Sequence, residues 1–220
     1  MWLSNALHWG RTRLRCSNKK HAMIQSFKGM IPVIHPSSYI HPSAVVIGHV
    51  TIGKDCYIGP GAVLRGDWGK VEIADGCNVQ ENCVLHMFPG KSVVLKTGAH
   101  VGHGASIHGA NLGRETLVGM NSVIMDDVEL GDGCIVGALS FLKAGSVWAE
   151  RGLIVGNPAK RIKEVSDEMY NHKVEGTALY RRLPQDMKNH SDEVVPLTEV
   201  VENRVEDFPN FDTWMNRSNK

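Results

Sequence analysis

Several features are scarce or missing in this sequence of 220 residues. No run approaches the roughly 18 consecutive apolar residues that a transmembrane helix needs, so no membrane span is expected. The 24 basic and 23 acidic residues nearly balance, which argues against a nucleic-acid surface. The five cysteines include no pair with CxxC spacing, and this argues against a zinc ribbon or a disulfide scaffold.

The basic charge is concentrated at the N-terminus, because the first 29 residues contain six lysines and arginines and no acid. Such a segment is typical of an organelle transit peptide. It also fits an unstructured extension, or upstream sequence in front of a start at Met23 or Met30. We favour the last two interpretations. Residues 1–29 are therefore expected to lie outside the folded unit, and the protein is expected to be cytoplasmic.

An aliphatic residue recurs every six positions from Ile40 to Leu142. The register shifts where residues 68–70 are inserted, again where four residues are inserted within 87–94, and once more where one residue is dropped before Leu112. The aliphatic series is Ile40, Val46, Ile52, Ile58, Leu64, Ile73, Val79, Leu85, Leu95, Val101, Ile107, Leu112, Val118, Ile124, Leu130, Val136 and Leu142. Glycine often follows the aliphatic residue, and a small residue is usual at the fifth position of each hexad.

This pattern closely resembles the hexapeptide signature of the left-handed parallel β-helix, so we expect an all-β solenoid over residues 30–158. Each hexad forms one strand and one turn, three hexads close one coil, and stability comes from stacking of the coils. Residues 159–184 place spaced apolar residues among charged ones and predict a C-terminal amphipathic α-helix that ends near Pro184. Residues 185–220 are expected to form a loose polar tail that can include a short helix.

The repeat also assigns structural places to most cysteines. The residues at the fifth position include Cys56, Cys77, Cys83 and Cys134. We expect them to be small buried apolar residues, and neither ligands nor nucleophiles. The histidines outside the predicted site, His100 among them, are expected at the surface or as caps.

Stacking of the hexads places potential metal-binding and catalytic side chains on particular faces of the solenoid. Hexads three apart lie on one face in successive coils, about 4.8 Å apart. By this rule Arg65, His86 and His108 form one vertical column, whereas Gln80 and His103 belong to a second face. A metal–nitrogen bond of about 2.0–2.1 Å leaves no room for a ligand from another face of the same prism. His103 should therefore come from a neighbouring chain, in a ring of three that closes the contact. The alternative is that all three histidines are exposed turn residues.

Three segments carry a resemblance to a known family. They are LRGD at residues 64–67, NVQENCVLH at 78–86 and GHGASIHG at 102–109, and they resemble the γ-class carbonic anhydrases. Further segments are similar to the branch of the phenylacetic acid degradation protein PaaY and the carnitine-operon protein CaiE. These are HMFPG at 86–90, GNPAK at 156–160, EVSDE at 164–168 and GTALY at 176–180.

The resemblance implies a homotrimer with a metal site at each subunit interface. His86 and His108 of one chain and His103 of the next are expected to bind Zn²⁺, or Fe²⁺ or Co²⁺. The ion lowers the pKa of bound water towards about 7 and so supplies a metal-bound hydroxide. Gln80, supported by Asn78, is expected to orient that hydroxide.

Further roles are implied for residues around the metal. Arg65 and Asp67 match an ion pair at the subunit interface, and Glu81 stands where the family prototype has an aspartate. The prototype also has acids that export protons, at the position of Trp68 and in the loop after His86. Their absence here makes fast CO₂ hydration harder. Together with Met87 and Phe88, Trp68 is expected to make the mouth of the site more apolar.

The expected function is that of a metal-dependent γ-carbonic anhydrase-like enzyme, for CO₂ hydration or for thioester hydrolysis of an acyl-CoA. One alternative is a hexapeptide acyltransferase that uses CoA and a histidine as general base. The other is a non-catalytic trimeric scaffold. The expected partners are other copies of the chain and a small substrate, with no nucleic acid and no membrane.

Overall fold

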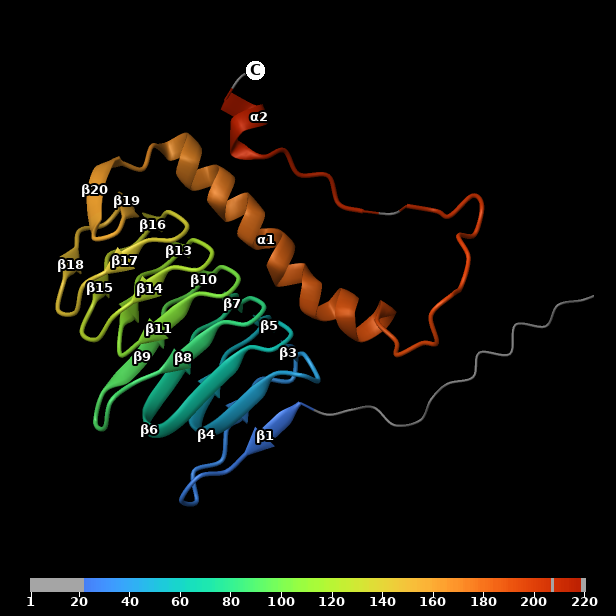
Figure 1. Ribbon diagram of the computed structural model, residues 1–220, viewed down its shortest axis with the longest axis horizontal. Coiled ribbons are helices and arrows are strands. Elements are labelled where there is room, and N and C mark those ends of the chain that lie inside the picture. The colour runs from blue at the N-terminus through green and yellow to red at the C-terminus, as the bar shows by residue number, and fades with distance from the viewer. Residues whose placement is uncertain (1–21, 207, 219–220) are drawn as a thin grey trace, which may run out of the picture.

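The computed structural model describes residues 22–206 and 208–218 as a parallel β-solenoid with one long helix along its side (Figure 1). The predictions made for residues 1–21, including a transit peptide, lie outside the described residues. Within the described part, no helix is long and apolar enough to cross a bilayer.

The first sheet has 12 strands and covers two faces of the solenoid. It contains β1 (Met23–Gln25), β2 (Val33–Ile34), β4 (Val45–Ile52), β6 (Val63–Ile73), β8 (Val84–His86), β9 (Ser92–Leu95), β11 (Ser106–His108), β12 (Asn111–Leu112), β14 (Val123–Ile124), β15 (Glu129–Leu130), β17 (Phe141–Leu142) and β18 (Val147–Trp148). The long strand β6 joins the two faces, because its first part pairs with β8 and its second part with β9.

The third face is an 8-stranded sheet. It contains β3 (Tyr39–Ile40), β5 (Tyr57–Ile58), β7 (Asn78–Val79), β10 (His100–Val101), β13 (Leu117–Val118), β16 (Ile135–Val136), β19 (Gly152–Gly156) and β20 (Ala159–Glu164). Among the described residues, every pair of named strands is parallel except β19 with β20. The predicted hexapeptide β-helix is thereby confirmed.

The repeat register is confirmed at the level of single residues. Every aliphatic residue of the series is buried except Ile40, which packs partly exposed against the core. Ile107 pairs with Leu85 in the neighbouring strand, and His108 pairs with His86. The buried interior therefore fixes which polar side chains stack on the outside of each face.

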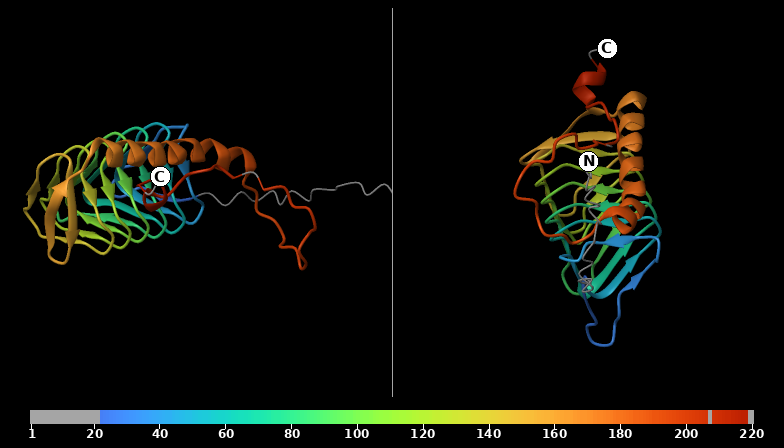
Figure 2. Two further views of the ribbon diagram at one scale, coloured as in Figure 1. Left: turned by 90° about the horizontal axis from the view of Figure 1, so that it is seen from above. Right: turned by 90° about the vertical axis from the view of Figure 1, so that its right-hand side faces the viewer.

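The helix α1 (Asp167–His190) lies along the 8-stranded sheet and contacts β3, β5 and β7 (Figures 1 and 2). Ser166 caps it, because its hydroxyl accepts a hydrogen bond of 3.2 Å from the backbone N–H of Met169. Lys173 and Thr177 are buried against the solenoid. The helix thus packs on its own chain, a point that the sequence left open.

Three boundaries differ from the sequence predictions. The solenoid begins with β1, inside the segment expected to be unfolded, because residues 23–25 pair with β4. Residues 159–164 form β20, since they pair back on β19 before the helix begins. Pro184 lies within α1, which continues to His190. The short helix considered for the tail is present as α2 (Trp214–Ser218).

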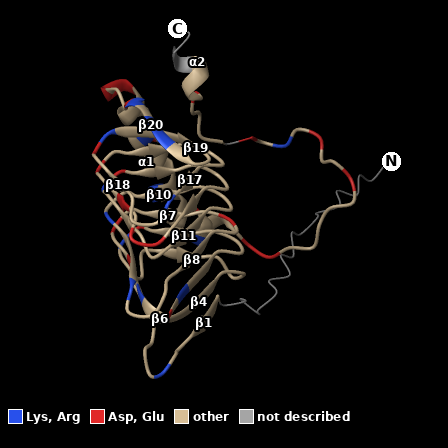
Figure 3. Cartoon of the chain, turned by 60° about the vertical axis from the view of Figure 1, so that its left-hand side comes forward, with Lys and Arg blue, Asp and Glu red and all other residues tan. Residues whose placement is uncertain are grey.

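The segment between α1 and α2 runs outside the solenoid (Figure 2). Its end returns to α1, where His172 Nε2–H donates a hydrogen bond of 2.8 Å to the carbonyl oxygen of Asp212. Figure 3 shows basic and acidic residues interspersed along the edges of the solenoid, with further acidic residues along this segment.

Candidate active site

Two of the three predicted metal ligands lie side by side on one face. His86 ends β8 and His108 ends the neighbouring strand β11, and the two are in register. Their ring centroids are 5.4 Å apart, with the ring planes inclined by 61°. The column expected from the hexad spacing is therefore present for both histidines.

Each of these histidines is held by a carboxylate. His86 Nε2 is 3.1 Å from Asp67 Oδ1, and His108 Nδ1 is 2.8 Å from Asp126 Oδ1. The sequence reasoning missed Asp126. A usable signal existed, since β11 and β14 pair with an offset of 17 residues, and Asp126 therefore directly follows the position opposite His108 in the next coil.

Arg65 and Asp67 form an ion pair within the chain, and its expected place at a subunit interface stays a prediction. The guanidinium donates to Asp67 Oδ2 from Nε at 3.0 Å and from Nη2 at 2.7 Å. Burial acts to raise the pKa of Asp67, but the hydrogen bonds and charge of Arg65, together with the hydrogen bond to His86, outweigh it and lower the pKa. Asp67 is thus an ionised acceptor that fixes the ring of His86.

His103 lies apart from this pair, in the turn after β10 on the other sheet. Its Nδ1 makes a short hydrogen bond with Glu81 Oε2, and Glu81 Oε1 accepts a hydrogen bond of 3.1 Å from the hydroxyl of Tyr57. No group of three potential metal-binding side chains occurs within the described part of one chain. That His103 reaches the site from a neighbouring chain remains a prediction.

Gln80 and Asn78 form a buried polar cluster with an unexpected third member. Gln80 Nε2 lies 3.2 Å from Asn78 Oδ1 and 2.7 Å from His100 Nε2. The expectation that His100 is a surface or capping residue is wrong, because α1 covers it and Tyr180 packs edge-on against its ring at 5.0 Å. Burial, assisted by the charge of Lys173, lowers the pKa of His100 to about 3.

Two aromatic side chains flank the histidine pair. The ring of Trp68 lies 5.3 Å from that of His86, and the ring of Phe88 lies 4.9 Å from that of His108. Both aromatic residues are about half exposed. Met87 does not join them, because it is fully buried in the core. The apolar rim predicted around the site therefore consists of Trp68 and Phe88.

The four cysteines of the described chain are buried and unpaired, as the repeat predicted. Burial raises the pKa of Cys56 and of Cys83 to about 11, and it also raises the pKa values of the other two. Their thiols remain protonated at neutral pH, so none is an activated nucleophile.

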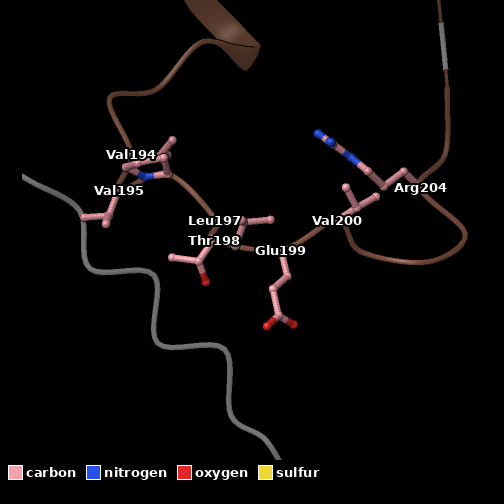
Figure 4. Close-up of a pocket in the computed structure, with 8 residues that line it drawn as sticks. Val194, Val195, Leu197, Thr198, Glu199, Val200 and Arg204 are labelled. Atoms are coloured by element: carbon pink, nitrogen blue, oxygen red, sulfur yellow. The ribbon is translucent and has the colours of Figure 1, made fainter.

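A hollow lies in the C-terminal segment. Figure 4 shows it lined by residues 194–200 and Arg204. Its lining contains valine, leucine and proline side chains, with Glu199 and Arg204 as the charged members and no histidine. It offers no paired acid, base or nucleophile, and the histidine pair therefore remains the candidate site.

Comparisons with known proteins identify relatives of the whole solenoid. The family model "Bacterial transferase hexapeptide (six repeats)" matches residues 31–66 and 109–144. The carnitine operon protein CaiE of Salmonella agona is 44% identical over 81% of this chain and 90% of its own length. CaiE of Escherichia coli K12 is 43% identical over 81% of this chain and 91% of its own length. The predicted similarity to the carnitine-operon branch is confirmed.

Two solved structures are also similar to this chain over most of its length. A Bacillus cereus protein provisionally assigned as an acetyltransferase has a TM-score of 0.75 and 32% identity, over 76% of this chain and 98% of that chain. A hexapeptide transferase family protein from Anaplasma phagocytophilum has a TM-score of 0.71 and 31% identity, over 74% of this chain and 96% of that chain. The descriptions of these two structures and of the family model favour the acyltransferase alternative over a carbonic anhydrase-like enzyme. The chain belongs to the bacterial hexapeptide transferase family, in the branch of the carnitine operon protein CaiE.

Proposed function

We propose that this protein is a homotrimeric enzyme that acts on thioesters of coenzyme A at sites between neighbouring chains. Each site would combine His86 and His108 of one chain with His103 of the next. One observation carries the proposal. All three histidines bind a carboxylate through one ring nitrogen, and the other ring nitrogen has no partner among the described residues.

This arrangement fits a divalent metal ion. Metal-binding histidines usually donate their second ring N–H to a carboxylate or carbonyl, which orients the ring and makes the ligand nitrogen more basic. Three neutral imidazoles suit Zn²⁺, Fe²⁺ and Co²⁺ alike. Bound there, such an ion would polarise a carbonyl and lower the pKa of a water molecule.

The other residues hold and shelter the reacting groups. Arg65 keeps Asp67 ionised, and Asp67 fixes His86. Gln80, braced by Asn78, would orient the water that attacks the thioester carbonyl. Trp68 and Phe88 would exclude bulk water and contact the acyl group. Because these apolar rings stand where proton-exporting acids are needed for fast CO₂ hydration, we place thioester hydrolysis before CO₂ hydration.

Acyl transfer is the second candidate, and the family membership and the Bacillus relative favour it. Here an amine or hydroxyl would replace water as the acceptor of the acyl group. His86 or His108 would serve as general base through its free ring nitrogen. The two candidates share the thioester substrate and differ in the acceptor and in the need for a metal ion.

The test is a set of assays on the purified protein loaded with Zn²⁺, Fe²⁺ or Co²⁺. We expect about one ion per chain, no ion in His103→Ala, and release of CoA from acetyl-CoA without any added acceptor. CoA release that requires an amine and persists after chelation would support acyl transfer instead. Stopped-flow CO₂ hydration measures the remaining activity. Metal-free protein without turnover of any substrate would refute both candidates and leave the scaffold interpretation.

A further inference from the structure

A histidine that no expected role uses lies next to the predicted site. His100 stands on β10, three residues before His103, and its ring is enclosed between Gln80 on the solenoid side and α1 on the other. Thr177, which is fully buried in α1, lies 3.5 Å from its Nδ1. Both ring nitrogens of His100 therefore face a polar atom.

The environment keeps this ring neutral. His100 lies under Tyr180 and beside the buried cation of Lys173, and both burial and that charge oppose protonation. A neutral imidazole has one N–H and one acceptor nitrogen. The position of that single proton determines which atom of the Gln80 amide can approach His100 Nε2.

The contacts of Gln80 favour one of the two arrangements. Its Nε2 faces both Asn78 Oδ1 and His100 Nε2, so both of its N–H groups are used if each of these atoms accepts. His100 Nε2 then carries no proton, and the proton lies on Nδ1, where it is donated to Thr177. Gln80 is only 2% exposed, and no hydrogen bond of its amide oxygen is found among the described residues.

We propose that His100 is a positioning residue, which holds the Gln80 amide with its oxygen turned towards the interfacial site. Gln80 then presents a hydrogen-bond acceptor and no donor. It can hold the O–H of an attacking water, or the N–H or O–H of another acyl acceptor, and it cannot stabilise an oxyanion. This inference rests on the proposed function for its substrate, but the orientation of the amide can be tested without any activity.

The spectroscopic test is nitrogen NMR of the ¹⁵N-histidine-labelled protein at pH 7, with the His100 signals assigned by their loss in His100→Gln. The expected result is a neutral ring with the proton on Nδ1 and a bare Nε2. A proton on Nε2, or a charged ring, would overturn the inference, because Gln80 would then have to turn its oxygen to His100.

The kinetic test compares three variants with the wild type. His100→Leu removes the acceptor, and Thr177→Val removes the partner of Nδ1–H at nearly constant size. Loss of one hydrogen bond predicts that kcat falls about tenfold in both, with KM little changed. His100→Gln can still accept from Gln80 and should recover most of the rate. Equal rates in the His100→Leu and His100→Gln variants, both folded as trimers, would refute the positioning role. An inactive wild type that shows the expected NMR signals would instead refute the proposed function alone.

Discussion

One carboxylate of the solenoid binds two cationic side chains of α1, and its removal gives a quantitative prediction. Glu115 accepts a hydrogen bond of 2.7 Å from Lys173 and a short one from Arg181, both on α1. The Lys173 side chain is only 3% exposed, whereas that of Arg181 is 33% exposed. Lys173 also donates to the carbonyl oxygen of Gly98 at 2.8 Å. Glu115→Gln therefore leaves a buried cation beside neutral acceptors.

The expected loss follows from this burial. Breaking a buried ion pair by removing one partner costs about 3–5 kcal/mol, because the other charge stays buried. Lys173 can reduce this cost by losing its proton. Burial already lowers its pKa to about 8, and Glu115 acts to raise it. Without Glu115 the pKa falls further. We expect a loss of about 3 kcal/mol at pH 6, where Lys173 is charged.

The sign of the pH dependence follows from proton linkage. The pKa of Lys173 is lower in the folded state than in the unfolded chain, so between the two values the unfolded chain binds more protons, and stability rises with pH. In Glu115→Gln this rise begins below pH 8, because the folded-state pKa is lower still. The difference between the wild type and the variant should therefore be less than half as large at pH 9 as at pH 6.

The assay is urea unfolding at pH 6 and pH 9, at one protein concentration because oligomers unfold in a concentration-dependent way. Hydrogen exchange of peptides from α1 reports whether the helix detaches first. The matched control is Glu129→Gln, because Glu129 is an exposed carboxylate that accepts a hydrogen bond from Asn111. We expect this control to change the free energy of unfolding by no more than about 0.5 kcal/mol. Equal losses in the two variants, or a loss that does not shrink at pH 9, would refute the reasoning.

Three further predictions concern the site, the thiols and the coils. Asp126→Asn weakens the hold on His108, and titration with Zn²⁺ should show affinity about 10–100-fold lower; unchanged affinity would contradict this role. Cys83 should react with a thiol reagent only after unfolding, because burial raises its pKa to about 11; rapid native-state labelling would disprove it. Gly119→Ala places a Cβ 2.4 Å from a backbone nitrogen of the next coil and should cost about 1–3 kcal/mol, whereas Gly152→Ala meets only contacts of 3.5 Å or more and should cost far less.

The sequence predicts the solenoid well because the same six-residue pattern recurs along most of the chain. The series of aliphatic residues determines the register, and the register alone places His108 beside His86. The insertion around Trp68 is also explained, since it becomes the middle of the long strand β6 that joins two faces. Features that follow from the period could therefore be predicted residue by residue.

Features that depend on packing outside the repeat could not be predicted in this way. Pro184 normally ends a helix because it lacks an N–H. Here it is buried within the helix, and α1 continues past it to His190. His100 occupies an outward position in its hexad, where exposure is the ordinary expectation. Its burial depends on where α1 lies, and no periodicity in the sequence carries that information.

The central claim is that two chains share each site, and complementation between variants tests it most directly. His103→Ala keeps the half-site of His86 and His108, whereas His86→Ala keeps His103. In trimers reassembled from an equal mixture, about one quarter of the interfaces should pair the two intact halves. Metal binding should return to about one quarter of the wild-type content, although each variant alone binds none. A mixture that binds no more metal than the separate variants would contradict the shared site.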